Sequence, residues 1–313
     1  MSGEGKRLVA RARILRDVRA FFDSRGYLEV ETPLAIPCPG LDLHLDAFEI
    51  VPEASLARAA APRFLSTSPE YQMKRLLADG YERIFQITRA FRAGELGDRH
   101  NPEFTILELY RANAGVDAVM RDTEQLVARV TGGEVTVGGR TIDTRPPFAR
   151  MTVCEAYERF ASVAPDETLR LAEHDEDRFF FLLVDVVEPA LAKLDHALFL
   201  TEYPATQASL ARKKPSDPRV AERFELYVAG VEVCNGFGEL TDAVEQRERF
   251  VRDQEERARR GKPVYPLDER FLEALARGMP ESGGNAIGLD RLVALATGST
   301  GIRDVLAFAD DEL

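Results

Sequence analysis

Phe91-Arg92-Ala93-Gly94-Glu95 and His100-Asn101-Pro102-Glu103-Phe104 stand on the two sides of a short polar segment, and they decide how this chain is interpreted. The apolar residues of Ile84 to Phe91 and of Phe104 to Tyr110 predict two strands joined as a long hairpin. An arginine at the exit of the first strand offers a charge-assisted fork for phosphate, and a phenylalanine offers a face for a base. An ordinary hairpin with a solvated loop explains the same residues equally well, so the rest of the chain must decide.

The sequence before the hairpin predicts a helix and two extended segments. Apolar residues recur at helical spacing from Leu8 to Arg25, and Gly26 ends the helix. Tyr27 to Pro33 follows as a short extended piece closed by proline, which is either a plain edge strand or part of a dimer interface. A further strand is expected to begin with Leu43 to Phe48.

Phe64 to Glu70 predicts a turn from a strand into a helix. Ser68 is a natural N-cap, and Pro69 fits the first helical position. A glutamate in the first turn, such as Glu70, is usually a partner of the helix dipole. If this turn faces the hairpin, the Glu70 carboxylate would instead hold an ammonium group, and both interpretations stay open.

The middle of the chain is less informative. Val116 to Val130 predicts a helix, and Val135 to Ile142, with two glycines at its turn, predicts a small β-hairpin. A more polar section has a helical middle around Val184 to Leu194. Thr241 to Arg260 predicts a charged helix that faces solvent.

Two carboxylates lie in the segment from Val231 to Leu240. Glu232 and Glu239 are separated by an Asn-Gly pair, and strand alternation alone would place them on opposite faces. A distortion at Gly236 and Gly238 would be needed to turn both towards one cavity. Carboxylates that face the phosphates of a nucleotide indicate Mg²⁺, because this hard ion prefers oxygen ligands.

Gly283 to Leu292 predicts a strand, a glycine turn and the start of a helix. Arg291 falls in the first turn of that helix, where its charge opposes the helix dipole. An external reason such as a bound phosphate would explain it, although a glycine-rich turn alone is weak support for a nucleotide site.

Composition is that of a globular protein, with 45% apolar and 30% charged residues among 313. No apolar run approaches the roughly 20 residues that a membrane helix needs. The first residues are charged and lack a signal-peptide core, so we expect a cytoplasmic protein. No repeat or linker divides the chain, and residues 1–313 are expected to form one domain.

Cysteines and charge exclude some functions. The three cysteines lie far apart without a CxxC pair, which argues against a zinc site or a disulfide framework. The net charge is −12 and no long basic stripe is present, so the chain is a poor candidate for gripping a large RNA. A small nucleotide held by a few arginines is compatible with this balance.

Taken in order, these segments resemble a known family, the class II aminoacyl-tRNA synthetases. The hairpin residues resemble motif 2, Gly288-Leu289-Asp290-Arg291 resembles motif 3, and the N-terminal helix with Pro33 resembles motif 1. Further stretches resemble the lysyl subgroup: Thr67-Ser68-Pro69-Glu70, Leu107-Glu108-Leu109-Tyr110, and Asn235-Gly236-Phe237 with Glu239. The resemblance covers nearly the whole chain and implies an α+β fold, in which an antiparallel sheet is flanked by helices, and a homodimer through residues 26–33.

Within that family, the chain is most similar to the elongation factor P lysine lysyltransferases, which are paralogues of the lysyl-tRNA synthetases. The motif 1 helix starts almost at Met1, so no N-terminal anticodon-binding OB-fold is expected. Ala286 stands where lysyl-tRNA synthetases have glycine and the paralogues have alanine, a change associated with a pocket for (R)-β-lysine. The resemblance therefore implies activation of (R)-β-lysine or lysine as an adenylate, with transfer to a lysine of elongation factor P.

The resemblance also implies roles for individual residues. Arg92 and Arg291 would be catalytic through contacts with the phosphates. ATP would be bound by Arg92, Ala93, Gly94, Glu95, Asn101, Phe104, Glu232, Val233, Gly288 and Arg291, and Mg²⁺ by Glu232 and Glu239. The amino acid would be bound by Ser68, Pro69, Glu70, Glu108, Tyr110, Glu239 and Ala286. Gly94 departs from the family, since many members have glutamate there, and Glu95 is the candidate to replace that contact.

Two alternatives remain. A truncated lysyl-tRNA synthetase would charge tRNA without an anticodon domain, and the acidic charge and Ala286 argue against it. A non-catalytic paralogue would only bind or regulate, and the retained Arg92, Glu232 and Arg291 argue against lost chemistry.

Overall fold

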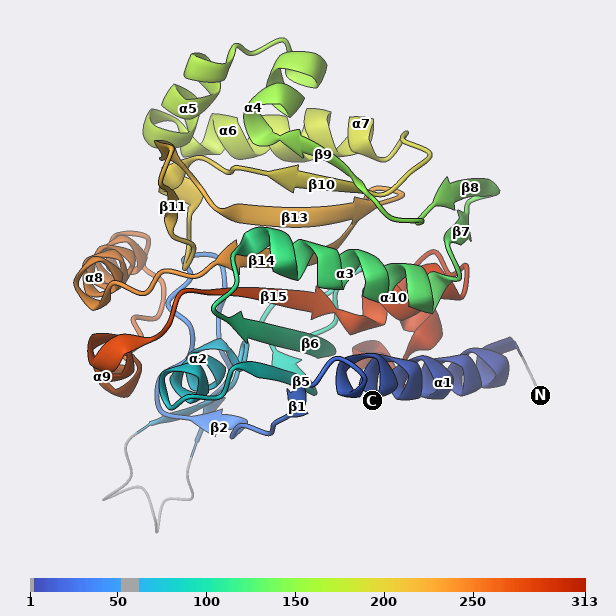
Figure 1. The fold of residues 1–313 in the computed structure, drawn as a ribbon, viewed down its shortest axis with the longest axis horizontal. Helices are drawn as coiled ribbons and strands as arrows, with labels where there is room; N and C mark the ends of the chain where they lie inside the picture. Colours follow the sequence, from blue (N-terminus) through green and yellow to red (C-terminus); the bar gives the residue numbers. More distant parts are fainter. Residues whose placement is uncertain (1–2, 52–61) are drawn as a thin grey trace.

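The computed structural model describes residues 3–51 and 62–313, and its main feature is an eight-stranded sheet (Figure 1). The strand order is β1-β5-β6-β15-β14-β13-β10-β9. The inner strands pair antiparallel, and the edge strands β1 and β9 pair parallel with their neighbours. The bounds are β1 Leu28–Glu29, β5 Arg83–Phe91, β6 Glu103–Ala112, β15 Ser282–Gly288, β14 Val231–Gly238, β13 Arg223–Val228, β10 Leu198–Thr201 and β9 Ala149–Thr152. The expected α+β fold with a mostly antiparallel sheet is confirmed.

Three smaller sheets accompany the main one, and one of them is the predicted hairpin with its glycine turn. Their strands are β2 Ala35–Ile36, β4 Arg63–Leu65 and β3 Glu49–Ile50, then β7 Glu134–Val137 and β8 Arg140–Asp143, and finally β11 Lys213–Lys214 and β12 Asp217–Ala221.

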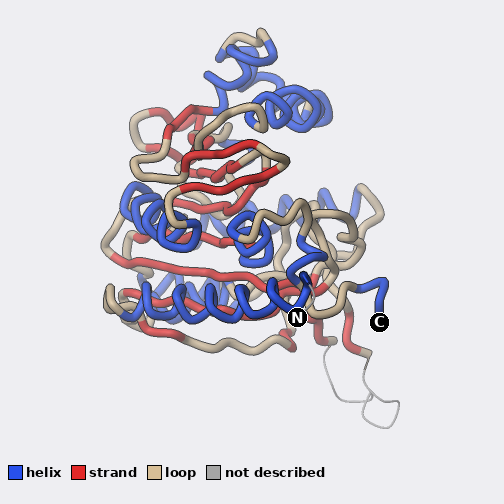
Figure 2. The backbone as a smooth tube through the Cα atoms, turned by 90° about the vertical axis from the view of Figure 1, so that its right-hand side faces the viewer, coloured by secondary structure: helices blue, strands red, loops and turns tan. Residues whose placement is uncertain are grey.

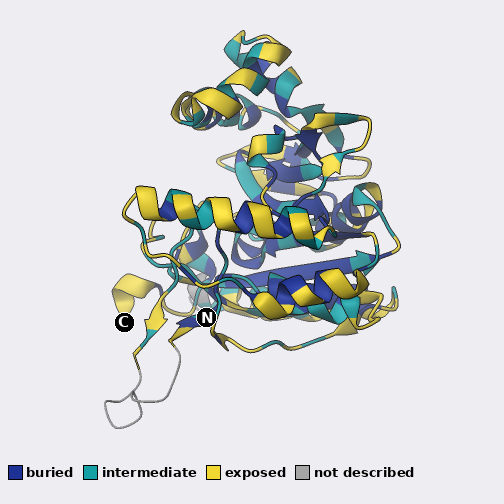
Figure 3. Ribbon diagram, turned by 90° about the vertical axis from the view of Figure 1, so that its left-hand side faces the viewer, coloured by how far each residue is buried: buried dark blue, intermediate teal, exposed yellow. Residues whose placement is uncertain are grey.

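The helices surround the main sheet, and their outer faces are exposed while the strands are buried (Figure 3). Their bounds are α1 Gly3–Asp23, α2 Glu70–Ala78, α3 Val116–Thr131, α4 Val153–Ala156, α5 Pro165–His174, α6 Glu176–Leu182, α7 Glu188–Leu191, α8 Ala243–Arg259, α9 Glu269–Gly278 and α10 Leu289–Ala296. Short π-helical and 3-10 turns are η1 Tyr157–Ala161, η2 Leu183–Val187, η3 Ala205–Gln207, η4 Ile302–Val305 and η5 Asp310–Glu312. Across the described ranges, no helix combines the length and apolar character that crossing a bilayer requires.

The two faces of the main sheet carry different side chains because successive residues of a strand point to opposite sides. Leu107 and Leu109 of β6 and Ile287 of β15 belong to the core that the sheet shares with α1, α3 and α10. On the other face, Glu108 lies opposite Ala286 and Tyr110 lies opposite Gly284. This second face forms the floor of the candidate site.

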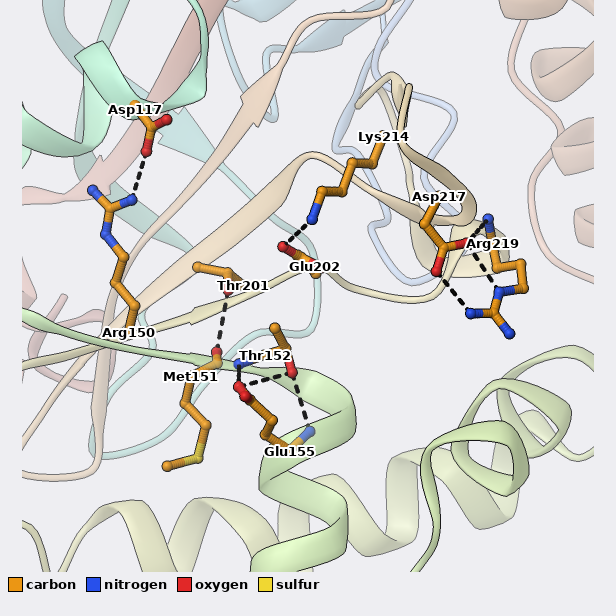
Figure 4. Close-up of polar contacts among 10 residues, drawn as sticks. All are labelled: Asp117, Arg150, Met151, Thr152, Glu155, Thr201, Glu202, Lys214, Asp217 and Arg219. Carbon is orange, nitrogen blue, oxygen red and sulfur yellow. Dashed lines mark hydrogen bonds and ion pairs between the residues drawn. The ribbon is translucent and has the colours of Figure 1, made fainter.

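Helices α4 to α7 form an insertion beyond the β10 and β9 edge of the sheet, and both views place it there (Figures 1 and 2). Its apolar residues make a separate core that includes Tyr157 and Phe179. Thr152 ends β9 and caps α4, because its hydroxyl accepts from the backbone of Glu155 at 3.1 Å while the Glu155 carboxylate accepts from the Thr152 N–H at 2.7 Å (Figure 4). The sequence predicted helix in this polar section only around Val184 to Leu194. The structure has helix there too, but the helical part already begins with α5 at Pro165.

The strand expected over Leu43 to Phe48 is wrong, because regular pairing begins only at Glu49. The backbone of this segment is held by scattered contacts rather than by regular strand pairing: the carbonyl of Phe48 accepts from the N–H of Leu65 in β4 at 2.9 Å, and the carbonyl of Asp46 accepts from the N–H of Ala93 at 2.7 Å. The N–H of Ala47 donates to the Tyr265 hydroxyl at 2.8 Å, and the guanidinium of Arg257 donates to the carbonyls of Asp42 and Leu45 at 2.7 and 2.9 Å. The segment is therefore an ordered loop, and part of it lines the cavity described below.

Helix α8 was expected to face solvent, but its charged sequence conceals a buried side. Arg257 is completely buried and lies 4.6 Å from the ring centroid of Tyr265, and Phe250 is also buried. The expectation failed because charge count does not reveal that the loop before β3 offers carbonyls to Arg257.

Candidate active site

A cavity of about 570 Å³ opens over the polar face of the main sheet. Most of the residues predicted from the sequence line it: Ser68, Glu70, Arg92, Glu95, Asn101, Phe104, Glu108, Glu232, Val233, Ala286, Gly288 and Arg291. Five other predicted residues are not part of its lining: Pro69, Ala93, Gly94, Tyr110 and Glu239. Segments far apart in the sequence thus meet in one space.

The hairpin supplies a cation and an aromatic ring to one end of the cavity. Strand β5 ends one residue before Arg92, whose N–H donates to the carbonyl of Pro102 at 2.9 Å and so fixes the start of the loop. The guanidinium carbon lies 5.0 Å from the ring centroid of Phe104. The buried Nε has no hydrogen-bond partner among the described residues. A donor held in this way is available to an anionic ligand.

The loop between the hairpin strands also turns Glu95 towards the cavity. Gly94 has a φ of +82°, a conformation that side chains with a Cβ rarely adopt. Glu95 follows it, lines the cavity and lies 3.7 Å from Arg92. The structure therefore places the Glu95 carboxylate beside Arg92, the predicted phosphate contact. Many family members carry a glutamate one residue earlier, at the position of Gly94.

Arg291 supplies a second cation at the same end. It stands in the first turn of α10, and its guanidinium donates to the carbonyl of Glu232 at 3.0 Å and contacts Nε2 of His100 at 2.7 Å. Burial and the nearby Arg291 hold the pKa of His100 below its usual value, so the imidazole is neutral and accepts this bond. Asp290 anchors the helix by accepting from the N–H of Thr105 at 2.7 Å.

Glu232 faces a carboxylate that the sequence did not reveal, Glu225 of β13. Strand β14 contains one extra residue at Val233, since Leu226 pairs with Cys234 but Tyr227 pairs with Glu232. This bulge changes the alternation and turns Glu232 to the cavity face. The distortion was expected at Gly236 and Gly238 but lies at Val233.

The environment of Glu232 is that of a site for a cation. Its side chain keeps 38% of its surface open to the cavity, yet the surrounding protein desolvates it, and burial together with Glu225 raises its pKa to about 7. Glu225 is itself held by Arg223 at 2.7 Å and by the Tyr227 hydroxyl at 2.8 Å. Among the described residues, no group of three or more His, Cys, Asp or Glu could hold a metal ion. Two carboxylates suit Mg²⁺, which is commonly bound by one or two carboxylates together with substrate phosphates.

The other end of the cavity is acidic. Glu108 is completely buried and accepts from the hydroxyls of Ser68 at 2.5 Å and Tyr110 at 2.9 Å. Burial and the charge of Glu70 raise the pKa of Glu108 to about 7. The predicted N-cap position of Ser68 is wrong by one residue, because α2 begins at Glu70 and Pro69 is its N-cap, although the Ser68 hydroxyl accepts from the N–H of Glu70 at 3.1 Å. Glu70 stands in the first turn of α2 and lines the cavity, and its hold on an ammonium group of a substrate stays a prediction.

Glu239 lies behind this acidic end and pairs with Lys74, a residue that the sequence analysis did not single out. Nζ of Lys74 lies 2.5 Å from Oε2 of Glu239 and 2.6 Å from Oε1 of Glu70. Burial raises the pKa of Glu239 to about 8, although Lys74 opposes the shift. The predicted partnership of Glu239 with Glu232 around one metal ion is not what the structure shows, because Glu239 belongs to the Lys74 cluster and Glu225 is the carboxylate beside Glu232. The helical spacing of Glu70 and Lys74 was the available signal.

Gly284 makes room for Glu239, and replacing it with alanine is expected to disturb this end of the cavity. A Cβ there would lie 2.2 Å from Oε1 of Glu239 and 2.4 Å from a ring carbon of Tyr110. Such overpacking typically costs about 1–3 kcal/mol of unfolding free energy. We expect Gly284→Ala to lower the thermal midpoint and to weaken amino-acid binding, while the affinity for ATP stays unchanged. Thermal unfolding measures the midpoint, and titration measures the two affinities.

The matched control is Gly97→Ala, at a site where an added Cβ meets no atom within 4 Å. Equal amino-acid affinity in Gly284→Ala and the unsubstituted protein would show that Glu239 and Tyr110 do not shape this end.

Comparison with known proteins shows the family of the chain. Residues 3–312 match the family described as tRNA synthetases class II (D, K and N). A relative from Haemophilus influenzae strain PittGG, named elongation factor P–(R)-beta-lysine ligase, is 40% identical over 99% of this chain and 97% of its own length. A relative of the same name from Salmonella dublin is 41% identical over 97% of this chain and 95% of its own length.

Proposed function

Because the chain belongs to the class II tRNA synthetases (D, K and N), we propose that it is an ATP-dependent ligase that activates (R)-β-lysine or lysine and transfers it to a lysine side chain of elongation factor P. The observation that carries this proposal is one cavity with two arginines and an aromatic ring at one end and buried carboxylates at the other. The names of the relatives, which match over nearly their full length, support the choice of amino acid and acceptor.

The first step forms an aminoacyl-adenylate. A carboxylate oxygen of the amino acid attacks the α-phosphorus of ATP, and the bond to the β-phosphate oxygen breaks to release pyrophosphate. Arg92, with its free Nε, would stabilise the charge that builds on the α-phosphate, and Arg291 would hold the outer phosphates. Phe104 would stack on adenine, and Asn101, Val233, Gly288 and Glu95 would complete the nucleotide pocket, with Ala93 and Gly94 shaping its loop.

The second step forms an amide. The neutral ε-amine of the acceptor lysine attacks the acyl carbon, the bond to the AMP oxygen breaks, and the amine loses a proton. Ser68, Glu70, Glu108 and Ala286 line the part of the cavity where the activated amino acid would lie. Pro69, Tyr110 and Glu239 would support this wall without touching the substrate.

Magnesium is expected to accompany ATP, and it neutralises phosphate charge when bound. Glu232 and Glu225 would hold it, because they form a desolvated carboxylate pair that faces the cavity. Their repulsion is offset in part by Arg291 and Arg223, and a divalent cation would offset it further.

We also propose that residues 1–313 form one catalytic domain. Two copies of this domain would form a homodimer through residues 26–33. Strand β1 is at the edge of the main sheet, and the side chain of Leu28 is 50% exposed there. We propose a cytoplasmic location, supported by the charged first residues that lack a signal-peptide core, and no binding of tRNA, supported by the net charge of −12.

We expect ATP–pyrophosphate exchange to be stimulated more by (R)-β-lysine than by α-lysine, and purified elongation factor P to gain the mass of one such residue on a lysine. Ala286, which borders the amino-acid region opposite Glu108, is the residue associated with this preference. Exchange is measured with labelled pyrophosphate and acylation by mass spectrometry.

The same assay separates the alternatives. Charging of purified tRNA without acylation of elongation factor P would favour a truncated lysyl-tRNA synthetase. A complete lack of exchange with either isomer would favour a non-catalytic paralogue.

A further inference from the structure

Lys74 is a buried cation that the proposed reaction does not use. It lies on α2 one turn after Glu70, its side chain has no exposed surface, and its Nζ contacts Glu70 at 2.6 Å and Glu239 at 2.5 Å. The ring centroid of Phe237 lies 6.0 Å from the same nitrogen. A solitary buried ammonium would be costly, so these carboxylates account for its presence.

The groups around Lys74 keep it charged. Burial alone favours the neutral amine, but Glu239 and Glu70 together hold the pKa of Lys74 above its usual value. The remaining titratable groups on this side are Glu108 and Tyr110 of β6, and they are hydrogen-bonded to each other. The ammonium is thus the one described positive charge that directly contacts the carboxylates of this cluster.

The carboxylates of the cluster occupy two layers. Glu70 and Glu108 line the cavity, whereas Glu239 lies behind the lining with 1% of its surface exposed. Among the described residues, neither oxygen of Glu239 has a partner with hydrogen-bond geometry. Lys74 therefore offsets the charge of Glu239 at 2.5 Å but leaves its hydrogen-bonding capacity unused. Three carboxylates and one ammonium have a formal net charge of minus two, and two ammonium groups of a bound substrate would offset the burial that raises the pKa values of Glu108 and Glu239.

We propose that Lys74 is a positioning residue that fixes Glu70 against the cavity and sets the charge of the amino-acid pocket to match a substrate with two ammonium groups. This inference rests on the proposed function, because (R)-β-lysine and lysine both carry two such groups. The carboxylate of the substrate does not enter this count of charges around Lys74, since it would face Arg92 at the other end of the cavity.

Removal of Lys74 leaves a buried carboxylate without its partner. In Lys74→Met, Glu239 or Glu70 must take up a proton or turn away, and the substrate loses a fixed partner. We expect the KM for the amino acid in pyrophosphate exchange to rise by at least about tenfold. The KM for ATP is expected to change by less than about twofold, because the cluster does not contact the nucleotide end.

A second substitution distinguishes charge balance from packing. Glu70→Gln alone lowers the negative charge of the pocket to one and should also raise the amino-acid KM. Combined in Lys74→Met/Glu70→Gln, the two changes restore a charge of minus two. We expect the double variant to have a lower amino-acid KM than either single variant, whereas independent structural damage would make the effects add.

Arg75→Met is the matched control, because Arg75 is a basic residue of the same helix outside the cavity lining. It should leave both KM values unchanged. Additive effects in the double variant, or an unchanged KM in Lys74→Met, would overturn the role of Lys74.

The proposed function and the role of Lys74 fail in different ways. Absence of exchange in the unsubstituted protein contradicts the function alone. The charge balance is then tested without substrate by thermal unfolding: Lys74→Met should lower the midpoint, and adding Glu70→Gln should recover part of the loss. A still lower unfolding midpoint in the double variant would contradict the proposed charge balance between Lys74 and Glu70.

Discussion

Replacing Arg92 by alanine is expected to reduce adenylate formation by about 100- to 1000-fold, the usual effect of removing one preorganised donor from a developing negative charge. The Nε of Arg92 is buried and has no hydrogen-bond partner in residues 3–51 and 62–313, while the backbone contact to Pro102 and the ring of Phe104 hold the side chain in place. This donor is aimed before the substrate arrives, so its loss should lower kcat more than it raises the KM for ATP.

The fold should survive this change. The ion pair of the side chain with Glu95 is long at 3.7 Å and partly exposed, and such pairs contribute little to stability. Arg89→Ala is the matched control, since Arg89 lies in β5, three residues before Arg92, but does not line the cavity. A rate of pyrophosphate exchange in Arg92→Ala within about threefold of the control would refute the assignment of Arg92 as the α-phosphate contact.

Replacing Glu232 by glutamine is expected to raise the Mg²⁺ concentration needed for half-maximal exchange by at least about tenfold, since even outer-shell partners of a metal site are worth about 10- to 100-fold in affinity. Glutamine keeps the shape of the side chain but removes the charge that Mg²⁺ would balance. Glu225 would remain as a single carboxylate, held by Arg223 and Tyr227. Saturating Mg²⁺ should therefore restore part of the rate.

The control for this variant is Glu245→Gln, which removes a carboxylate of α8 that does not line the cavity. If Glu232→Gln and Glu245→Gln required the same Mg²⁺ concentration, Glu232 would not be a metal ligand. An equal rise in the amino-acid KM and the Mg²⁺ requirement would instead place Glu232 between the two ends of the site.

The sequence predicted the elements whose signals are local. The apolar spacing of the first helix, the hairpin around Arg92, and the change from strand to helix before Arg291 are all found within a few residues of their expected bounds. Each of these depends on neighbours in the chain, and hydrophobic period and turn residues report on such neighbours directly. Most of the residues that the motifs assigned to the site then line the cavity.

The sequence could not reveal contacts made across the fold. The segment from Leu43 to Phe48 has the composition of a strand, but the carbonyl of Leu45 and that of the preceding Asp42 accept from Arg257, far away in the chain. Helix α8 therefore has a buried face that its charge conceals. Glu225 stands in an otherwise apolar strand and gave no signal in the sequence. Only the pairing of β13 with β14 shows that it lies beside Glu232 at the cavity.

The sequence by itself determined the α+β fold, the family and the two arginines, because motif residues and periodicity are properties of the chain alone. The tertiary structure decided which carboxylates act together. An extra residue at Val233 turns Glu232 towards Glu225, and one helical turn places Lys74 between Glu70 and Glu239. Charges interact through space, so the partners of a buried carboxylate follow from strand register and helix packing rather than from distance along the sequence.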